Sequence, residues 1–202
     1  MRKTRVYSKL PFRCLIGVDE AGRGPLAGPL AVCALMMRDK KSLRFFAGIK
    51  DSKQLSEKKR EVWFEKIRSA AERGVLSYEV ALVSNKEIDK KGMSFCLKDG
   101  VRYALSVFAL DAKDTLVLLD GTLHAPKDFP HQVTVIKGDE RERIIAMASI
   151  MAKVARDRYM TELSKKYPAY GFEIHKGYGT KKHYAALARY GASAAHRRTF
   201  IG

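Results

Sequence analysis

Four acidic residues stand where short apolar runs of the sequence end. Asp19 and Glu20 close a run that begins at "CLIGV", Asp120 closes "TLVLL", and Asp139 comes directly after "HQVTVIKG". In open α/β sheets, functional groups gather beyond the carboxyl ends of strands, so three strands would deliver these acids to one place. Converging carboxylates repel one another unless a cation lies between them. The pattern therefore predicts a site for a hard divalent cation such as Mg²⁺, which prefers oxygen ligands.

Two such cations, about 3.5–4 Å apart, can clamp an in-line displacement at phosphorus by activating water and stabilising the leaving oxygen. The alternative is that each acid is an ordinary turn or capping residue, which explains one of them well but four of them poorly. Neighbouring residues of a regular strand point to opposite faces. Asp19 and Glu20 can therefore share one site only if their strand ends or twists near Ala21 and Gly22.

A glycine-rich stretch, "GRGPLAG", begins two residues after Glu20. It matches neither the dinucleotide-binding G-x-G-x-x-G pattern nor the phosphate-binding P-loop. Pro25 and the apolar run that follows also remove the helix that both motifs need. We expect Gly22, Arg23 and Gly24 to form a loop whose backbone can approach a ligand closely.

The chain is strongly basic, with 39 Lys and Arg against 22 Asp and Glu and a net charge of +17. Such an excess attracts polyanions, of which nucleic acid is the commonest. Residues 164–202 form the most basic segment, and they also carry tyrosines, among them Tyr167, Tyr170, Tyr178 and Tyr184, a mixture that suits phosphates and sugars. A charge run alone is usually a solvated surface, so it supports nucleic-acid binding only together with an active site.

The apolar patterning alternates between strand and helix along the chain. Ser56, Asn85 and Thr180 are expected to cap helices, and Gly92 to weaken or divide the second of them. The fold class is therefore α/β, a mixed sheet flanked by helices in one domain over residues 1–202, with a basic helical extension from about residue 164. The expected strands are 14–19, 29–37, 75–83, 115–120 and 131–136, and the expected helices 56–74, 85–109, 140–167 and 181–190.

Cysteine usage and hydropathy indicate the compartment. Cys14, Cys33 and Cys96 are widely spaced and form no C-x-x-C pair, which argues against disulfides or a zinc site and fits a reducing environment. The five histidines also lack zinc spacing. The longest apolar run is too short to cross a bilayer and contains a proline, and no signal peptide is recognisable. We expect a cytoplasmic protein without membrane contact and, because no clamp-binding peptide ends the chain, a monomer.

The stretch "GVDEAGRGPLAGP" resembles the signature of the type 2 ribonucleases H, specifically the bacterial ribonuclease HII family. The resemblance continues in the same order over nearly the whole chain. It includes "DSKQLS", "LLDG", "KGD", "ASIMAKVARDRYM", "HKGYGTKKH" and "HRRTF".

The resemblance implies a ribonuclease-H-like fold with a helical C-terminal extension. It implies endonucleolytic cleavage of RNA in RNA–DNA hybrids and incision 5′ of a ribonucleotide embedded in duplex DNA, with 3′-hydroxyl and 5′-phosphate ends. Such an enzyme uses Mg²⁺ or Mn²⁺ and acts in ribonucleotide removal from DNA and in removal of primer RNA.

Carried onto this sequence, the resemblance also implies roles for individual residues. Gly22, Arg23 and Gly24 match the segment whose backbone contacts the ribose 2′-hydroxyl, Tyr178 matches a tyrosine that packs on the sugar, and Lys53 a lysine near substrate phosphate. The metal-binding and catalytic acids would be Asp19, Glu20, Asp120 and Asp139.

Asp157 is the main rival for the fourth ligand position, because it lies in the family-like segment "KVARDRYM". Arg156 and Arg158 flank it well inside an expected helix, which favours a structural ion pair. We therefore assign the metal role to Asp139.

Two other interpretations compete with this one. The first is a ribonuclease HIII-like hybrid nuclease, although that family's signature carries GKG where this chain has Gly22-Arg23-Gly24, and its members typically have an extra N-terminal domain. The second is a basic nucleic-acid-binding protein without enzymatic activity. It explains the charge of +17 but leaves the acids at three strand ends unexplained.

Overall fold

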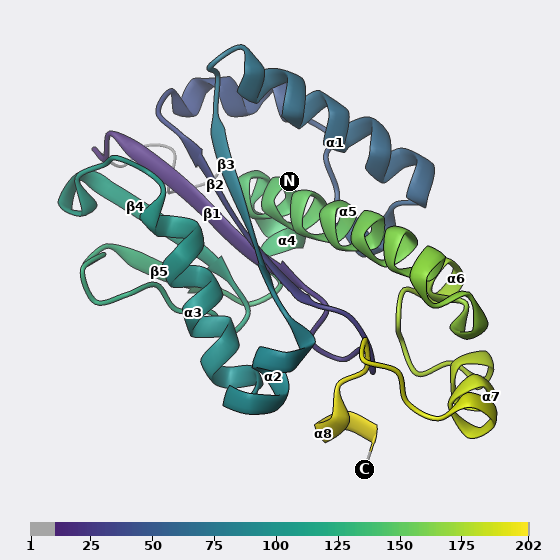
Figure 1. Ribbon diagram of the computed structural model, residues 1–202. Coiled ribbons are helices and arrows are strands. Elements are labelled where there is room, and N and C mark those ends of the chain that lie inside the picture. Colours follow the sequence, from purple (N-terminus) through teal and green to yellow (C-terminus); the bar gives the residue numbers. More distant parts are fainter. Residues whose placement is uncertain (1–10, 202) are drawn as a thin grey trace.

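The computed structural model describes residues 11–201, which form a five-stranded mixed sheet with helices on both faces (Figure 1). The strand order is β3-β2-β1-β4-β5. β1 is antiparallel to β2 and parallel to β4. On the two outer sides, β3 is antiparallel to β2 and β5 is parallel to β4. This is the α/β class that the sequence predicts. The strands are β1 (Cys14–Ala21), β2 (Leu30–Met37), β3 (Ser77–Val83), β4 (Thr115–Asp120) and β5 (Gln132–Val135).

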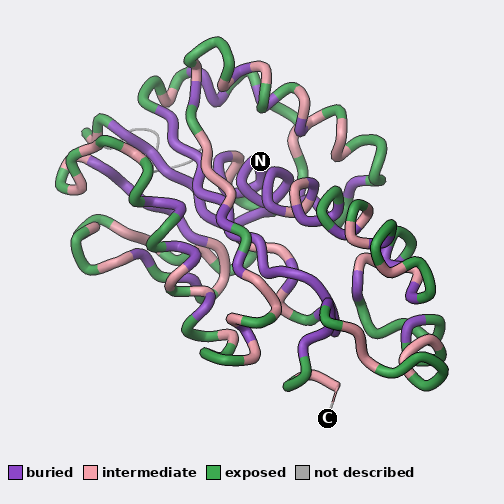
Figure 2. Tube along the Cα trace, viewed as in Figure 1, coloured by how far each residue is buried: buried purple, intermediate pink, exposed green. Residues whose placement is uncertain are grey.

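Each face of the sheet has its own apolar core, because successive strand residues point to opposite sides. Leu15 and Cys33 face the long helices α1 (Glu57–Glu72) and α5 (Arg143–Lys166). Ile16 and Val32 face the other side, where α3 (Met93–Ser106) covers the sheet. The strands β1 and β2 are therefore buried on both faces, as the continuous purple of the central trace shows (Figure 2).

The helix boundaries confirm most of the expected caps. The side chains of Ser56 and Thr180 accept hydrogen bonds from the first turns of α1 and α7 (Lys181–Tyr190). Asn85 is not a cap, however: Ser84 takes that place by accepting from the Glu87 N–H, and Asn85 begins α2 (Asn85–Lys91). Gly92, with φ of 79°, divides α2 from α3.

The helix expected over 140–167 is two helices. A one-turn helix, α4 (Gly138–Arg141), precedes α5, and the extended backbone of Glu142 separates them. The short turns elsewhere are η2 (Lys40–Phe46), η3 (Ser52–Gln54) and η4 (Ala112–Asp114).

The C-terminal segment is helical, as expected, and folds back onto the loop between β1 and β2 (Figure 1). Ala27 of that loop forms an isolated antiparallel bridge with His196. A small core that includes Met160, Tyr170 and Phe172 fills the space beneath the bridge. The segment contains η5 (Pro168–Tyr170), α6 (Phe172–His175), α7 and α8 (Arg198–Ile201).

Candidate active site

Two carboxylates lie side by side at the ends of the central strands. Val18 of β1 is in parallel register with Leu119 of β4, so the next residues, Asp19 and Asp120, face the same side of the sheet. That side is the one that α5 covers. Asp19 is only 3% exposed, so its charge is largely removed from solvent.

Asp139 completes the cluster from the segment beyond β5. It lies in α4, and the preceding Gly138 donates its backbone N–H to Asp120 Oδ1 over 2.6 Å. One carboxylate oxygen from each of Asp19, Asp120 and Asp139 lies within 4.8 Å of the others. The structure thus brings together three of the four acids that the strand-end pattern selected.

Glu20 stands beside this cluster rather than within it. β1 ends at Ala21, which pairs with Ala31 of β2, so the strand stops where the sequence analysis requires for Asp19 and Glu20 to approach one site. The Glu20 carboxylate instead forms an ion pair with Arg23, with Oε1 2.5 Å from Nε. Its other oxygen, Oε2, is buried and has no hydrogen-bond partner among residues 11–201. Glu20 therefore keeps one oxygen available for a ligand.

Burial and mutual repulsion disfavour the charged forms of these acids. Burial, followed by the charges of Glu20 and Asp120, raises the pKa of Asp19 well above its ordinary value. Burial also raises the pKa of Glu20, although Arg23 opposes the shift. A bound cation would stabilise the ionised carboxylates. Closely spaced oxygen donors and an orphaned buried oxygen fit a hard divalent ion that fills its other positions with water or phosphate oxygens.

Two polar side chains that the sequence interpretation did not select support the cluster. Asp51, the buried N-cap of η3, accepts from the Lys53 N–H over 2.9 Å, and its carboxyl lies close enough to that of Asp139 to raise the pKa of Asp139. The hydroxyl of Ser149 on α5 lies 2.9 Å from that of Ser52, and Ser149 partly opposes the rise in the pKa of Asp19. Neither residue ends a strand, so the strand-end rule could not find them. The one available signal for Asp51 was its place at the head of "DSKQLS".

A buried arginine holds the glycine loop in place. Arg197, which is fully buried, donates to the carbonyl oxygen of Gly22 over 2.7 Å and to that of Arg23 over 2.9 Å. A third bond from its Nε reaches the Gly28 carbonyl over 3.0 Å. The N–H groups of Arg23 and Gly24, by contrast, take no hydrogen-bond partner within residues 11–201. The loop therefore has backbone N–H groups available to a ligand, whereas the carbonyls of Gly22 and Arg23 are hydrogen-bonded to Arg197.

A second buried arginine ties this loop to the segment that carries Tyr178. Arg156 of α5 donates to the Pro29 carbonyl over 2.9 Å and to the Lys176 carbonyl over 3.0 Å. Gly22 packs directly on Arg156, since a Cβ at Gly22 would lie 2.2 Å from the arginine Nε. The Tyr178 ring, 41% exposed, has its centroid 5.6 Å from the guanidinium carbon.

Asp157 lies outside the acidic cluster. It forms an ion pair with Lys153, one helical turn away, with 2.7 Å between Oδ1 and Nζ. The expected structural ion pair is present, but its partner is not a flanking arginine, because Arg158 pairs with Glu61. The Lys153 ammonium also lies 5.8 Å from the centroid of the Tyr178 ring.

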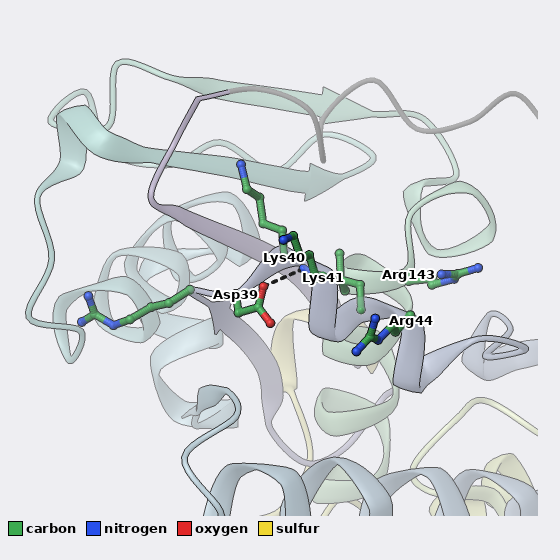
Figure 3. A pocket seen from close by; sticks show the side chains of 7 residues that line it. Asp39, Lys40, Lys41, Arg44 and Arg143 are labelled. Atoms are coloured by element: carbon green, nitrogen blue, oxygen red, sulfur yellow. Dashed lines mark hydrogen bonds between the residues drawn. The ribbon is translucent and has the colours of Figure 1, made fainter.

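Basic side chains continue away from the acids. The Lys53 ammonium lies 3.7 Å from Asp139 Oδ2, and the Lys53 side chain is 78% exposed. A separate pocket of about 420 Å³ opens where β2 leads into η2 and α5 begins. Figure 3 shows that the ends of Lys40, Arg44 and Arg143 there point in different directions, which suits an extended polyanion better than one small anion. The pocket is lined by Arg38, Asp39, Lys40, Lys41, Leu43, Arg44 and Arg143.

We expect the substitution Asp139→Asn to stabilise the metal-free protein at neutral pH. Burial, then the Asp51 and Asp120 carboxyls, raises the pKa of Asp139 to about 6. Since this value exceeds the ordinary one for unfolded Asp, the folded state binds more protons, and stability falls as pH rises from about 4 to about 6. In EDTA at pH 7.5 the variant should therefore gain about 2 kcal/mol over wild type.

Thermal unfolding at pH 4.5 and 7.5, followed by circular dichroism, measures this difference. The gain should shrink at the lower pH, where the wild-type carboxyl is already protonated. A variant that melts below wild type at pH 7.5 would show that the Asp139 charge is well tolerated without a cation. Asp99→Asn, on the distant helix α3, controls for the substitution itself.

Comparison with solved structures defines the class of protein. The ribonuclease H2 of Pyrococcus horikoshii OT3 superposes with a TM-score of 0.73 at 31% identity, over 93% of this chain and 94% of that one. The ribonuclease HII in a complex with PCNA from Archaeoglobus fulgidus gives a TM-score of 0.72 at 27% identity, over 91% and 93% of the two chains. The fold is that of the type 2 ribonucleases H.

Sequence comparison narrows the class to one family. The family profile described as Ribonuclease HII matches residues 16–202. Ribonuclease HII of Caldicellulosiruptor bescii is 44% identical over 94% of this chain and 87% of its own length, and that of Clostridium beijerinckii is 45% identical over 94% and 68%. The chain belongs to the ribonuclease HII family. It is accordingly a hydrolase, an endonuclease of the ribonuclease H type, which settles the choice against a binding protein without enzymatic activity.

None of the helices within residues 11–201 is long and apolar enough to cross a membrane.

Proposed function

We propose that this enzyme cuts the RNA strand of RNA–DNA hybrids and also incises duplex DNA on the 5′ side of a single embedded ribonucleotide, leaving 3′-hydroxyl and 5′-phosphate ends. One observation carries the proposal: the acid cluster and a loop of free backbone donors occupy the same strand end. Asp19 precedes Gly22 by three residues, so a phosphate held at the acids places its sugar beside the loop. Such an activity serves ribonucleotide removal from DNA and removal of primer RNA.

We assign Asp19, Asp120 and Asp139 as ligands for two divalent ions, Mg²⁺ or Mn²⁺, with Glu20 as a further ligand through its free Oε2. Bound ions of this kind polarise the scissile phosphate and lower the pKa of the attacking water. The protein's own part is to hold the oxygens that receive the ions in a fixed arrangement.

Hydrogen bonds around the carboxylates supply that arrangement. The Gly138 N–H donates to Oδ1 of Asp120 and so fixes the position of this carboxylate. Asp51, fixed by the hydrogen bond that it accepts from the Lys53 N–H, lies against the Asp139 carboxyl. Lys53, which reaches from Asp139 to solvent, would neutralise a neighbouring phosphate of the substrate.

Recognition of the sugar falls to Gly22, Arg23, Gly24 and Tyr178. The free N–H groups of Arg23 and Gly24 would donate to the 2′-hydroxyl, the one group that distinguishes RNA from DNA at a given position. The half-exposed Tyr178 ring would pack on the adjoining sugar and reject one that is displaced. Neither group reads a base edge, so cleavage should depend little on base sequence.

The assay is a labelled DNA duplex with one ribonucleotide, incubated with Mg²⁺ or Mn²⁺, beside a fully hybrid duplex and an all-DNA duplex. We expect a single cut 5′ of the ribonucleotide, degradation of the hybrid and no cut in DNA. Cleavage of the hybrid alone would favour the HIII-like alternative. An intact ribonucleotide substrate under both metals, or a cut on its 3′ side, would overturn the proposal.

Substrate binding should depend strongly on salt, because the protein's partners in this proposal are nucleic-acid duplexes and its net charge is +17. The double substitution Arg44→Ala with Arg143→Ala, in the basic pocket, should reduce the slope of log K against log salt by about two. Fluorescence anisotropy of a labelled hybrid in EDTA at several KCl concentrations measures the slope. An unchanged slope would mean that the pocket does not contact the bound duplex.

We also propose that the protein is a monomer, and the mass measured by analytical ultracentrifugation tests this.

A further inference from the structure

Three histidines that the proposed chemistry does not use form a buried group behind Tyr178. His175 of α6 stacks on His183 of α7 with ring centroids 4.5 Å apart, and His196 lies 5.2 Å from His183. All three are buried, and Phe172 packs edge-on against the first two rings. Buried imidazoles normally need a partner for each nitrogen, and here every ring nitrogen has one.

The backbone partners of the two rings indicate where their protons lie, and the Ser193 hydroxyl, 2.8 Å from His196 Nδ1, can donate to that nitrogen as well. The Ser193 backbone N–H points at His196 Nδ1 over 3.0 Å, so this nitrogen must accept and the ring must carry its proton on Nε2. His196 Nε2 lies 3.0 Å from His183 Nε2 and donates to it. His183 therefore carries its proton on Nδ1 and donates it to the Tyr178 carbonyl over 2.9 Å.

Protonation of His183 on Nε2 would place two donors face to face across the His183–His196 contact, and protonation of His196 on Nδ1 would oppose the Ser193 N–H, so both rings are neutral. The electrostatic surroundings agree with this assignment. Burial lowers the pKa of His183, and burial together with His183 lowers the pKa of His196 to about 4. No nitrogen remains to bind a metal ion, since His175 accepts from Gly177 N–H and donates to the Tyr170 carbonyl.

Both ends of this chain of hydrogen bonds lead to the groups assigned to sugar recognition. One end is the backbone of Tyr178. The other is His196, whose neighbour Arg197 donates to the carbonyls of Gly22 and Arg23. The His183–His196 bond is thus a direct connection between the segment that carries the aromatic ring and the segment that holds the glycine loop.

We infer that His183 and His196 are positioning residues that set the distance between Tyr178 and the glycine loop, and so the fit of a ribose between them. The inference rests on the proposed function, because it gives these rings a role only if a sugar is recognised there. It predicts that loss of the His183–His196 hydrogen bond lowers turnover of ribonucleotide substrates without weakening the protein's affinity for the phosphate backbone.

The first test is spectroscopic and needs no variant. Long-range ¹H–¹⁵N correlation of the ¹⁵N-histidine-labelled full chain at pH 7 should show His183 protonated on Nδ1 alone and His196 protonated on Nε2 alone. His183→Asn and His196→Gln assign the signals. A charged ring, or His183 protonated on Nε2, would contradict the proposed His183–His196 hydrogen bond whether or not the protein cuts nucleic acid.

The second test is kinetic. His183→Phe keeps the ring and removes both nitrogens, which leaves the Tyr178 carbonyl and the His196 N–H without partners; we expect kcat/KM on the single-ribonucleotide duplex to fall about 10-fold or more. Affinity for an all-DNA duplex in EDTA should stay within twofold. His183→Asn, whose amide can still donate to the Tyr178 carbonyl, should recover part of the loss.

A merely structural role predicts a different result. It would lower the melting temperature and the affinity for all duplexes together, and its effect would add to that of Tyr178→Ala. If His183 acts through Tyr178, the double variant should instead be little worse than Tyr178→Ala alone. His131→Phe, on an exposed residue just before β5, is the matched control. Should wild type cut the ribonucleotide and His183→Phe cut it equally well, the inference fails while the proposed function stands.

Discussion

Asp120→Asn is expected to abolish turnover while the fold and substrate binding survive. An asparagine oxygen can still accept the hydrogen bond that Gly138 donates to Asp120 Oδ1, so the local backbone keeps its partner. What disappears is one negative charge from a cluster whose oxygens lie within 4.8 Å of one another. Losing that charge weakens cation binding at the reacting phosphate, and we expect kcat to fall about 1000-fold, roughly 4 kcal/mol of barrier.

Single-turnover cleavage of the ribonucleotide duplex in Mg²⁺ measures this loss, and anisotropy in EDTA measures binding. Affinity should be unchanged or higher, because a carboxylate that repels phosphate is gone. Asp99→Asn, the same change on α3, should behave as wild type. Turnover within tenfold of wild type would show that Asp120 is not a metal ligand, and it would contradict the mechanism proposed above.

Gly22→Ala is expected to damage both stability and sugar recognition. Gly22 has φ of +96°, where a side chain is strained, and an added Cβ would lie 2.2 Å from Arg156 Nε and 2.9 Å from the Pro29 carbonyl oxygen. Neither neighbour can move freely, because the Nε of Arg156 is bonded to that same carbonyl. Strain and overpacking together should cost about 2–4 kcal/mol. The loop must shift to relieve them, and kcat/KM should fall about 100-fold.

Gly74→Ala separates backbone strain from crowding in this experiment. Gly74 also has a positive φ, +72°, but nothing lies within 4 Å of the Cβ that would be added. We expect a loss of about 1 kcal/mol in stability and unchanged cleavage. Thermal melts and kcat/KM on the ribonucleotide duplex give both quantities. Equal effects of the two substitutions would mean that the contact with Arg156 is unimportant for the loop.

The positions of the strand-end acids can be predicted from the apolar pattern of the sequence. Runs such as "TLVLLD" identify buried strands, and the register of parallel strands then carries Asp19 and Asp120 to the same face. Asp139 needs only a short connection beyond β5 to join them. These placements follow from periodicity and chain connectivity, which are properties of neighbouring residues.

Other features depend on contacts between distant residues. The place of Glu20 depends on where β1 ends, which is Ala21, and on an ion pair with Arg23 that apolar patterning does not signal. Asp51 reaches Asp139 from a turn that carries no periodic signal. The carbonyl partners of Arg197 lie at the other end of the sequence, and no spacing rule connects a basic tail residue with them. Such packing is visible only in three dimensions.

The shape of the glycine loop depends on a guanidinium that lies 175 residues later in the chain than Gly22. The β1–β2 hairpin can pair early because its strands are neighbours, whereas ordering so distant a contact costs loop-closure entropy and comes late. A chain without Arg197 would leave the carbonyls of Gly22 and Arg23 without this partner, so the sugar-testing loop would lose its support while the carboxylates kept theirs.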